Sequence, residues 1–134
     1  MISGKYELTI AWDGNYPHPT IRPGADNVEL PDFEKMTASS DFKQPGPITH
    51  YIEFYEENGV MKACHQTELS KQLVDDLVIS ANCVSWKAYS GSEGVDLWQY
   101  CLAYTEISDD VAGVSFGIEP FFRGYMKIFG KKIS

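Results

Sequence analysis

Two histidines and one glutamate are the residues whose types and spacing could support chemistry. His50 and His65 fall on two extended runs, Ile48–Glu57 and Val60–Gln66, and Glu68 follows His65 by three residues. Imidazole and carboxylate groups ligate zinc and act as general acids and bases, so these three could form part of a metal site or an acid–base pair. The alternative is that both histidines lie at the margin of a sheet and hydrogen-bond to loop backbone.

The second interpretation is favoured because no third ligand is positioned by the spacing. Cys64 is next to His65, but adjacent strand residues point to opposite faces, so the two do not form a nucleophile and its base. No glycine pattern matches a phosphate-binding loop. We therefore predict no catalytic residue, no metal and no cofactor, and we expect a binding protein rather than an enzyme.

A hairpin must position the two histidines. Asn58-Gly59 separates the two extended runs, and this pair best accepts the positive φ angles of a type I′ turn. With a two-residue loop at this place, the residue numbers of two cross-strand partners add up to 117. Ile52 therefore lies opposite His65. The face predicted to form the core side carries His50, Ile52, Phe54, Met61, Ala63 and His65.

Two helices are predicted beyond this hairpin. Thr67 is suited to cap a helix that begins at Glu68, and an apolar stripe at helical spacing extends to Ala81. The stripe consists of Leu69, Leu73, Val74, Leu77, Val78 and Ala81. A short C-terminal helix is predicted to begin at Glu119 and Pro120, with Arg123, Lys127 and Lys131 along one basic face.

The remaining alternation predicts strands. Residues 6–12 alternate apolar with polar side chains, residues 84–89 and 95–105 read as a second hairpin, and residues 111–118 form another strand. Six of the seven prolines fall between residues 13 and 47, which indicates a long loop. The predicted fold class is α+β, as a single domain over residues 1–134. An antiparallel and possibly strongly curved sheet of about five or six strands carries one main helix and a short C-terminal helix.

The charge distribution limits the partners that this chain can bind. The net charge is −8, and residues 1–119 carry all 19 acidic side chains against seven of the 11 basic ones. A surface of this sign repels phosphate, so nucleic acid is not an expected partner. No signal peptide and no membrane-spanning run is recognisable, and three cysteines do not make a disulfide framework. We therefore expect a cytoplasmic protein without a membrane partner.

These observations favour a small acidic binding protein. The leading hypothesis is an inhibitor or immunity-type protein that neutralises a basic protein, for example a nuclease toxin. Its partner-binding carboxylates would be Asp75, Asp76, Glu56, Glu57, Asp109 and Asp110, and its aromatic anchors Trp12, Tyr51, Tyr55 or Trp98. The alternative is a small-molecule-binding or enzymatic curved-sheet domain that uses His50, His65 and Glu68 in an aromatic pocket. A subunit of a larger assembly is a third possibility, and the oligomeric state is left open.

Overall fold

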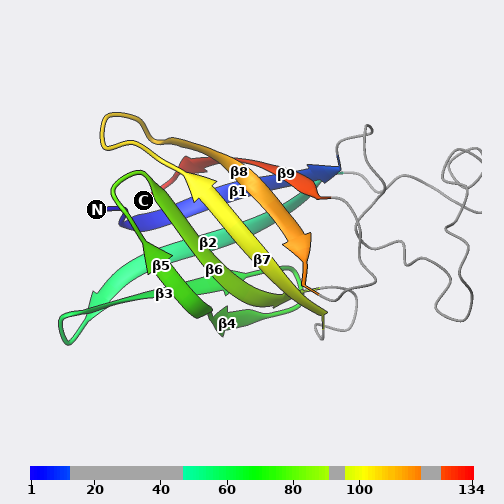
Figure 1. The fold of residues 1–134 in the computed structure, drawn as a ribbon, viewed down its shortest axis with the longest axis horizontal. Helices are drawn as coiled ribbons and strands as arrows, with labels where there is room; N and C mark the ends of the chain where they lie inside the picture. Colours follow the sequence, from blue (N-terminus) through cyan, green and yellow to red (C-terminus); the bar gives the residue numbers. More distant parts are fainter. Residues whose placement is uncertain (13–46, 91–95, 119–124) are drawn as a thin grey trace, which may run out of the picture.

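The nine strands found in the described residues belong to one antiparallel sheet. The computed structural model describes residues 1–12, 47–90, 96–118 and 125–134 (Figure 1). The strands are β1 (Gly4–Trp12), β2 (Ile48–Glu57), β3 (Val60–Gln66), β4 (Lys71–Leu73), β5 (Asp75–Ile79), β6 (Cys83–Ser90), β7 (Asp96–Ala103), β8 (Asp110–Gly117) and β9 (Met126–Lys132). Their order in the sheet is β4-β3-β2-β1-β9-β8-β7-β6-β5.

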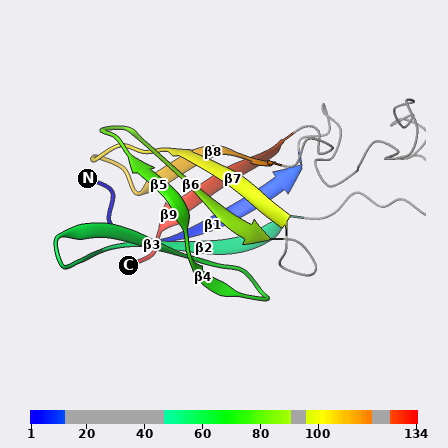
Figure 2. The ribbon, with the colours of Figure 1, turned by 60° about the horizontal axis from the view of Figure 1, so that its bottom comes forward.

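This order makes a nearly closed barrel. The first strand pairs with the last, and β4 and β5, which end the strand order on opposite sides, are separated in the chain only by Val74. Figure 2 shows the sheet curling so that these two ends approach each other. The strand order therefore corrects the predicted α+β class: within the described residues the fold is all-β, with nine strands rather than five or six and no helix.

The predicted helix from Glu68 to Ala81 is wrong, and its residues form β4 and β5. The side chains of Leu69 and Leu73 are exposed, so the helical stripe does not face a core. Inward-facing residues instead alternate, and a bulge between Asp75 and Val78, with Asp76 at φ 50°, shifts this alternation by one residue. The inward set, which packs partly buried against the core, is Val74, Leu77 and Ile79.

Thr67 does cap a turn, although no helix follows it. Its hydroxyl accepts hydrogen bonds from the backbone N–H groups of Leu69 and Ser70, each at 3.1 Å. The backbone N–H of Thr67 in turn donates to the carbonyl of Ser70 at 2.8 Å. The capping chemistry was therefore predicted from the sequence, but the same hydroxyl bonds equally well to a tight turn between two strands.

The predicted C-terminal helix is also wrong where the structure describes it. Residues 126–132 form β9, which lies between β1 and β8. Lys127 and Lys131 still share one face, because residues four apart lie on the same side of a strand as well as of a helix. Arg123, like the proline-rich segment 13–46, lies outside the described residues.

The first hairpin is confirmed in detail. Asn58 and Gly59 adopt positive φ angles of 53° and 79°, and the pairing of β2 with β3 sets Ile52 opposite His65. β6 and β7 also pair as the predicted second hairpin. Alternate residues of both hairpins fill the barrel interior, and the largest fully buried side chains include Trp86, Tyr100, Phe54, Leu8, Ile10 and Ile52.

The two faces of β7 differ in burial. Trp98, Tyr100 and Leu102 point into the barrel and are buried, whereas Ala103 on the outer face is exposed. Gly113 of the neighbouring strand β8 explains the close approach of the two strands: a Cβ there would lie 1.8 Å from the carbonyl oxygen of Cys101. Across the described residues, no helix has the length and apolar character that a membrane crossing requires.

Candidate functional site

The barrel brings His50 and His65 together in its interior. They lie on β2 and β3 as diagonal neighbours, because the Asn58-Gly59 turn fixes the register between these strands. The Nε2 atom of His65 is 2.8 Å from Nδ1 of His50, which is a direct hydrogen bond. His65 is 0% exposed and His50 is 5% exposed, so both imidazoles belong to the core rather than to the margin of the sheet.

A third polar group fixes the protonation of both rings. The indole Nε1–H of Trp86, on β6, donates to Nδ1 of His65 at 3.0 Å. An indole nitrogen can only donate, so neutral His65 carries its proton on Nε2 and donates it to Nδ1 of His50. The result is a directional chain of hydrogen bonds from Trp86 through His65 to His50, which holds its own proton on Nε2.

Aromatic rings enclose this chain of hydrogen bonds. The ring of Tyr100 stacks on that of Trp86, with centroids 5.4 Å apart and planes inclined by 8°, and it lies 4.5 Å from the ring of His65. The edge of Phe54 also contacts Trp86, with centroids 5.8 Å apart. Such packing places the imidazoles in a medium of low polarity, where a positive charge is poorly solvated.

Both histidines are consequently held neutral. Burial lowers the pKa of His50 from its ordinary 6.5 to about 4. Burial, together with the neighbouring His50, lowers the pKa of His65 to about 3. At neutral pH the pair therefore carries no charge, and its hydrogen bonds depend on neutral imidazoles.

The geometry leaves little for these histidines to do as ligands or bases. Both ring nitrogens of His65 are used in hydrogen bonds, so it presents no lone pair to a metal or a substrate. Glu68, the predicted third member, lies exposed in the turn between β3 and β4, away from the buried rings. Among the described residues, no group of three or more His, Cys, Asp or Glu side chains could hold a metal ion.

Four of the six predicted partner-binding carboxylates lie beside one gap in the barrel wall. This gap, which we call the open seam, separates residues 60–62 of β3 from β5, since β3 pairs with β4 only over residues 64–66. Glu56 and Glu57 lie on β2 opposite Met61 and Val60, on one side of the open seam. Asp75 and Asp76 begin β5 on the other side, directly after Val74, whose N–H bonds the carbonyl of Ala63.

Two of these four carboxylates have local cationic partners. The Nζ atom of Lys62 lies 3.3 Å from Oε1 of Glu57, and the Nζ atom of Lys87 lies 2.8 Å from Oδ2 of Asp76. Ion pairs at such exposed positions contribute little to stability, because water and salt screen them. Among the described residues, Glu56 and Asp75 have no ion-pair partner and remain exposed. The open seam is thus flanked by an excess of negative charge.

Of the other predicted residues, Tyr55 lies next to Glu56 on β2, opposite Lys62, and the rest are not brought to the open seam. Asp110 lies on β8 opposite Lys131, and Asp109 precedes it. Tyr55 is half-buried on the outer face of β2, Trp98 is buried in the core, and the side chain of Trp12, at the end of β1, lies outside the described residues. The structure therefore divides the predicted partner-binding set between different parts of the barrel.

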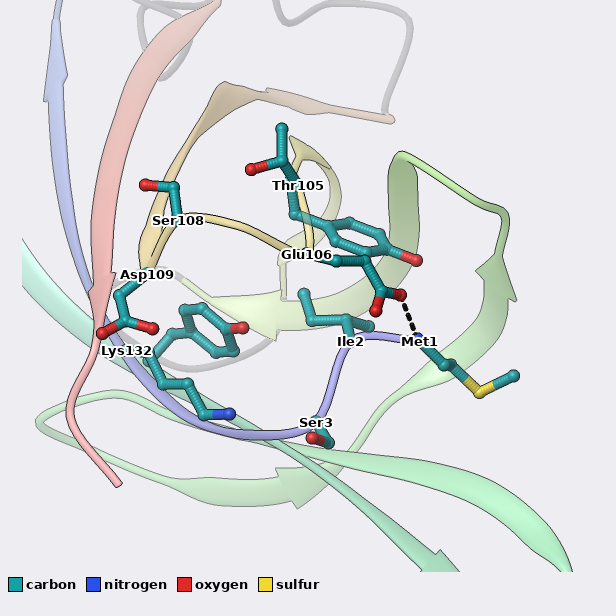
Figure 3. A pocket seen from close by; sticks show the side chains of 10 residues that line it. Met1, Ile2, Ser3, Thr105, Glu106, Ser108, Asp109 and Lys132 are labelled. Carbon is teal, nitrogen blue, oxygen red and sulfur yellow. Dashed lines mark hydrogen bonds and ion pairs between the residues drawn. The ribbon is translucent and has the colours of Figure 1, made fainter.

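A polar cavity of about 210 Å³ lies at the rim near the first residues of the chain. Figure 3 shows the carboxylate of Glu106 directed at the amino group of Met1, with which it forms an ion pair, while Asp109 and Lys132 lie near each other at the left of the view, apart from that pair. The cavity is lined by Met1, Ile2, Ser3, Tyr6, Tyr104, Thr105, Glu106, Ser108, Asp109 and Lys132. No histidine or cysteine belongs to this lining.

A second gap, between β4 and the end of β6, is closed by a side chain. The amide of Gln72 donates to the carbonyl of Tyr89 at 2.8 Å and accepts from the N–H of Tyr89 at 2.9 Å. One side-chain amide thereby takes the place of a paired peptide group. We call this place the closed seam.

Sequence reasoning missed the two seams and the role of Trp86. Alternation on residues 84–89 does indicate that Trp86 faces inward, but its contact with His65 depends on how the barrel closes. The doublets Glu56-Glu57 and Asp75-Asp76 were recognised as acidic, whereas nothing in their spacing indicates that they flank one opening.

Comparison with known proteins finds no family model, no curated protein and no solved structure that matches this chain. The predicted inhibitor or immunity role therefore has no support, and the α+β architecture that accompanied it is wrong.

Proposed function

We propose that this chain is a binding protein that recognises a basic partner protein through the carboxylates beside the open seam. What supports the proposal is one observation: two acidic doublets, nearly twenty residues apart in the sequence, lie on opposite sides of the same gap in the wall. Charged groups arranged in this way steer a partner of opposite charge and set its orientation.

The contrast with the interior strengthens this proposal. The histidines, which are the groups most suited to catalysis, are neutral, buried and bonded to each other and to Trp86. The carboxylates of Glu56 and Asp75 are exposed and have no cationic partner among the described residues. The unpaired charged groups beside the open seam are therefore acidic, and the net charge of −8 acts in the same direction at longer range.

Capture from a lysate of the source organism tests the proposal when two variants of equal charge are compared. The seam variant carries Glu56→Gln, Glu57→Gln, Asp75→Asn and Asp76→Asn. Asn at position 76 also tolerates the positive φ found there. The control variant changes four exposed carboxylates elsewhere, with Glu7→Gln, Glu68→Gln, Asp109→Asn and Asp110→Asn.

We expect a basic protein that the wild-type chain and the control variant retain and the seam variant loses. Its retention should fall as salt concentration rises, because salt screens exposed charges. Equal loss from both variants would mean that net charge alone acts, and retention by the seam variant would overturn the proposal. Circular dichroism of the three chains should be the same, since all of these side chains are exposed.

A further inference from the structure

The open seam presents backbone hydrogen-bonding groups as well as charge. In an antiparallel ladder, alternate residues direct N–H and C=O toward opposite neighbours. Asn58-Gly59 closes the hairpin, so Val60 and Lys62 bond to β2, whereas Met61 and Ala63 turn away from it; the bond from Val74 to the Ala63 carbonyl agrees with this assignment. Within the described residues no strand pairs with Met61 on that side.

The opposite edge has the same character. Ser80 donates its N–H to the carbonyl of Cys83 across the β5–β6 turn, and Val78 lies opposite Ser85. By the same alternation, Ile79 directs its N–H and C=O away from β6 and toward the open seam. Two strand edges whose backbone groups have no strand partner within residues 1–12, 47–90, 96–118 and 125–134 therefore border one gap, and such edges are templates for a further strand.

The side chains of the seam favour an extended segment with an apolar face. Met61, Leu77 and Ile79 pack against the core but are only partly buried. Apolar residues at alternate positions of an incoming strand would complete their burial, since every second side chain of a strand faces the same side. The residues between them would face outward, toward Asp75 and the exposed carboxylates of β2.

Charge decides which extended segment is suitable. A second copy of this chain would bring its own net charge of −8 against the same carboxylates. A segment with Lys or Arg at its outward positions would instead meet Glu57 and Asp75, which by strand alternation face outward on the two sides of the seam, and Asp75 has no cationic partner among the described residues. Opposite charges beside an edge also fix the register of the added strand.

From these observations we infer that an extended segment of the partner, in which apolar residues alternate with Lys or Arg, adds as a tenth strand between β3 and β5. This inference rests on the proposed function, because it takes the basic partner as given. It adds the mode of binding, which is β-strand addition, and the sequence pattern that is recognised.

A blocked heptapeptide of alternating lysine and valine, KVKVKVK, is the probe for this inference. We expect it to bind the full chain and to slow hydrogen exchange at the amides of Met61 and Ile79 by about tenfold or more, because both would become hydrogen-bonded. The matched control is the same peptide with every peptide nitrogen methylated. It keeps every side chain and charge but can donate a hydrogen bond to neither edge, and it should give no protection.

Two variants separate the edge from the charge. Met61→Pro removes the N–H that faces the seam, at a position where β3 does not bond to β2, and should abolish the protection of Ile79. If this variant does not fold, the methylated peptide still tests the same hydrogen bonds. The seam variant of the preceding section keeps both edges, and it should bind the peptide about tenfold more weakly.

The outcomes distinguish this inference from the proposed function. Protection by the methylated peptide, protection at Tyr89 instead of Met61 and Ile79, or no binding at all would overturn strand addition, while the lysate result could still support a basic partner. Protection of equal strength in the seam variant would uphold the edge and refute recognition by charge. Protection that appears with rising protein concentration and no peptide would make a second copy the occupant and would overturn the inference.

Discussion

The barrel wall has two gaps on either side of one bent segment of chain, and only one of them is closed. At the closed seam, the amide of Gln72 bonds both backbone groups of Tyr89. At the open seam, neither Met61 nor Ile79 has a strand partner on the side that faces the gap, as far as the described residues show; Met61 pairs only with β2 and Ile79 only with β6. Both gaps arise at Val74. The chain pairs with β3 up to Leu73 and with β6 from Asp75 onward, so each of these two strands is left with an edge beside the bend.

The interior behind each gap explains the difference. Gln72 is the cross-strand partner of His65, so the closed seam covers the hydrogen-bonded chain of Trp86, His65 and His50. The open seam covers Met61 and other apolar side chains that are only partly buried. Buried polar groups lose their hydrogen bonds if water competes for them, whereas partly exposed apolar groups tolerate contact with water. The wall is therefore sealed where its interior is polar.

The largest expected effect is acid unfolding through the sealed histidines. Their pKa values are about 4 and 3 in the folded barrel and near 6.5 in the unfolded chain. Below pH 6.5 the unfolded chain binds protons that the folded barrel excludes, so the unfolding free energy falls as pH falls. The slope is about 1.4 kcal/mol per pH unit for each histidine, or about 5 kcal/mol for both between pH 6 and pH 4.

Urea unfolding at several pH values measures this slope. His65→Leu should reduce it by about half, because one of the two proton-linked groups is gone. His18→Gln is the control histidine, in a segment outside the described residues. An unfolding free energy that does not change between pH 6 and pH 4 would show that water reaches the imidazoles and that the wall is not sealed.

Local signals predicted those parts of the fold that depend on neighbouring residues. The Asn58-Gly59 turn and the alternation around it gave the register of β2 and β3, because positive φ angles and side-chain direction are decided within a few residues. Residues 69–81 were mistaken for a helix since their apolar positions suit both periods once the bulge at Asp76 is allowed. Pairing with β3 and then β6, which are distant in sequence, decides between the two.

The candidate site was predictable only in its components. The neighbourhood of His50 and His65 followed from the hairpin register, and the acidic doublets followed from residue type. The bond from Trp86 to His65 and the position of Asp75 beside β3 depend on the closure of the whole barrel. Barrel closure brings these residues together by pairing strands that are far apart in the sequence. The alternation of apolar and polar residues along a strand does not predict which strands pair.

A smaller effect is expected when the closed seam is opened. Gln72→Leu removes two hydrogen bonds and leaves the exposed backbone of Tyr89 to water, so the unfolding free energy should fall by about 1–2 kcal/mol. Hydrogen exchange at the Tyr89 amide should become faster. Gln66→Leu is the matched control, because Gln66 lies on the outer face of β3. Equal effects of the two variants would contradict the role given to Gln72.

The smallest effect on stability is expected at the open seam. Met61→Thr shortens a partly buried side chain at a β-favourable position, and we expect a loss of about 1 kcal/mol or less. Ile52→Thr places a hydroxyl at a fully buried position on the same face of the neighbouring strand, and it should cost about 2–3 kcal/mol. Thermal unfolding of both variants gives the comparison directly.

The ratio of these two losses in unfolding free energy measures how exposed the interior is at the open seam. A strand that lacked a neighbour only because the barrel curves tightly would bury Met61 as fully as Ile52, and the two losses would then be equal. A small loss for Met61→Thr together with weakened peptide binding would instead mean that this side chain stabilises a complex more than the free barrel. Residue 61 would then belong to a binding edge, as its outward-facing backbone groups require.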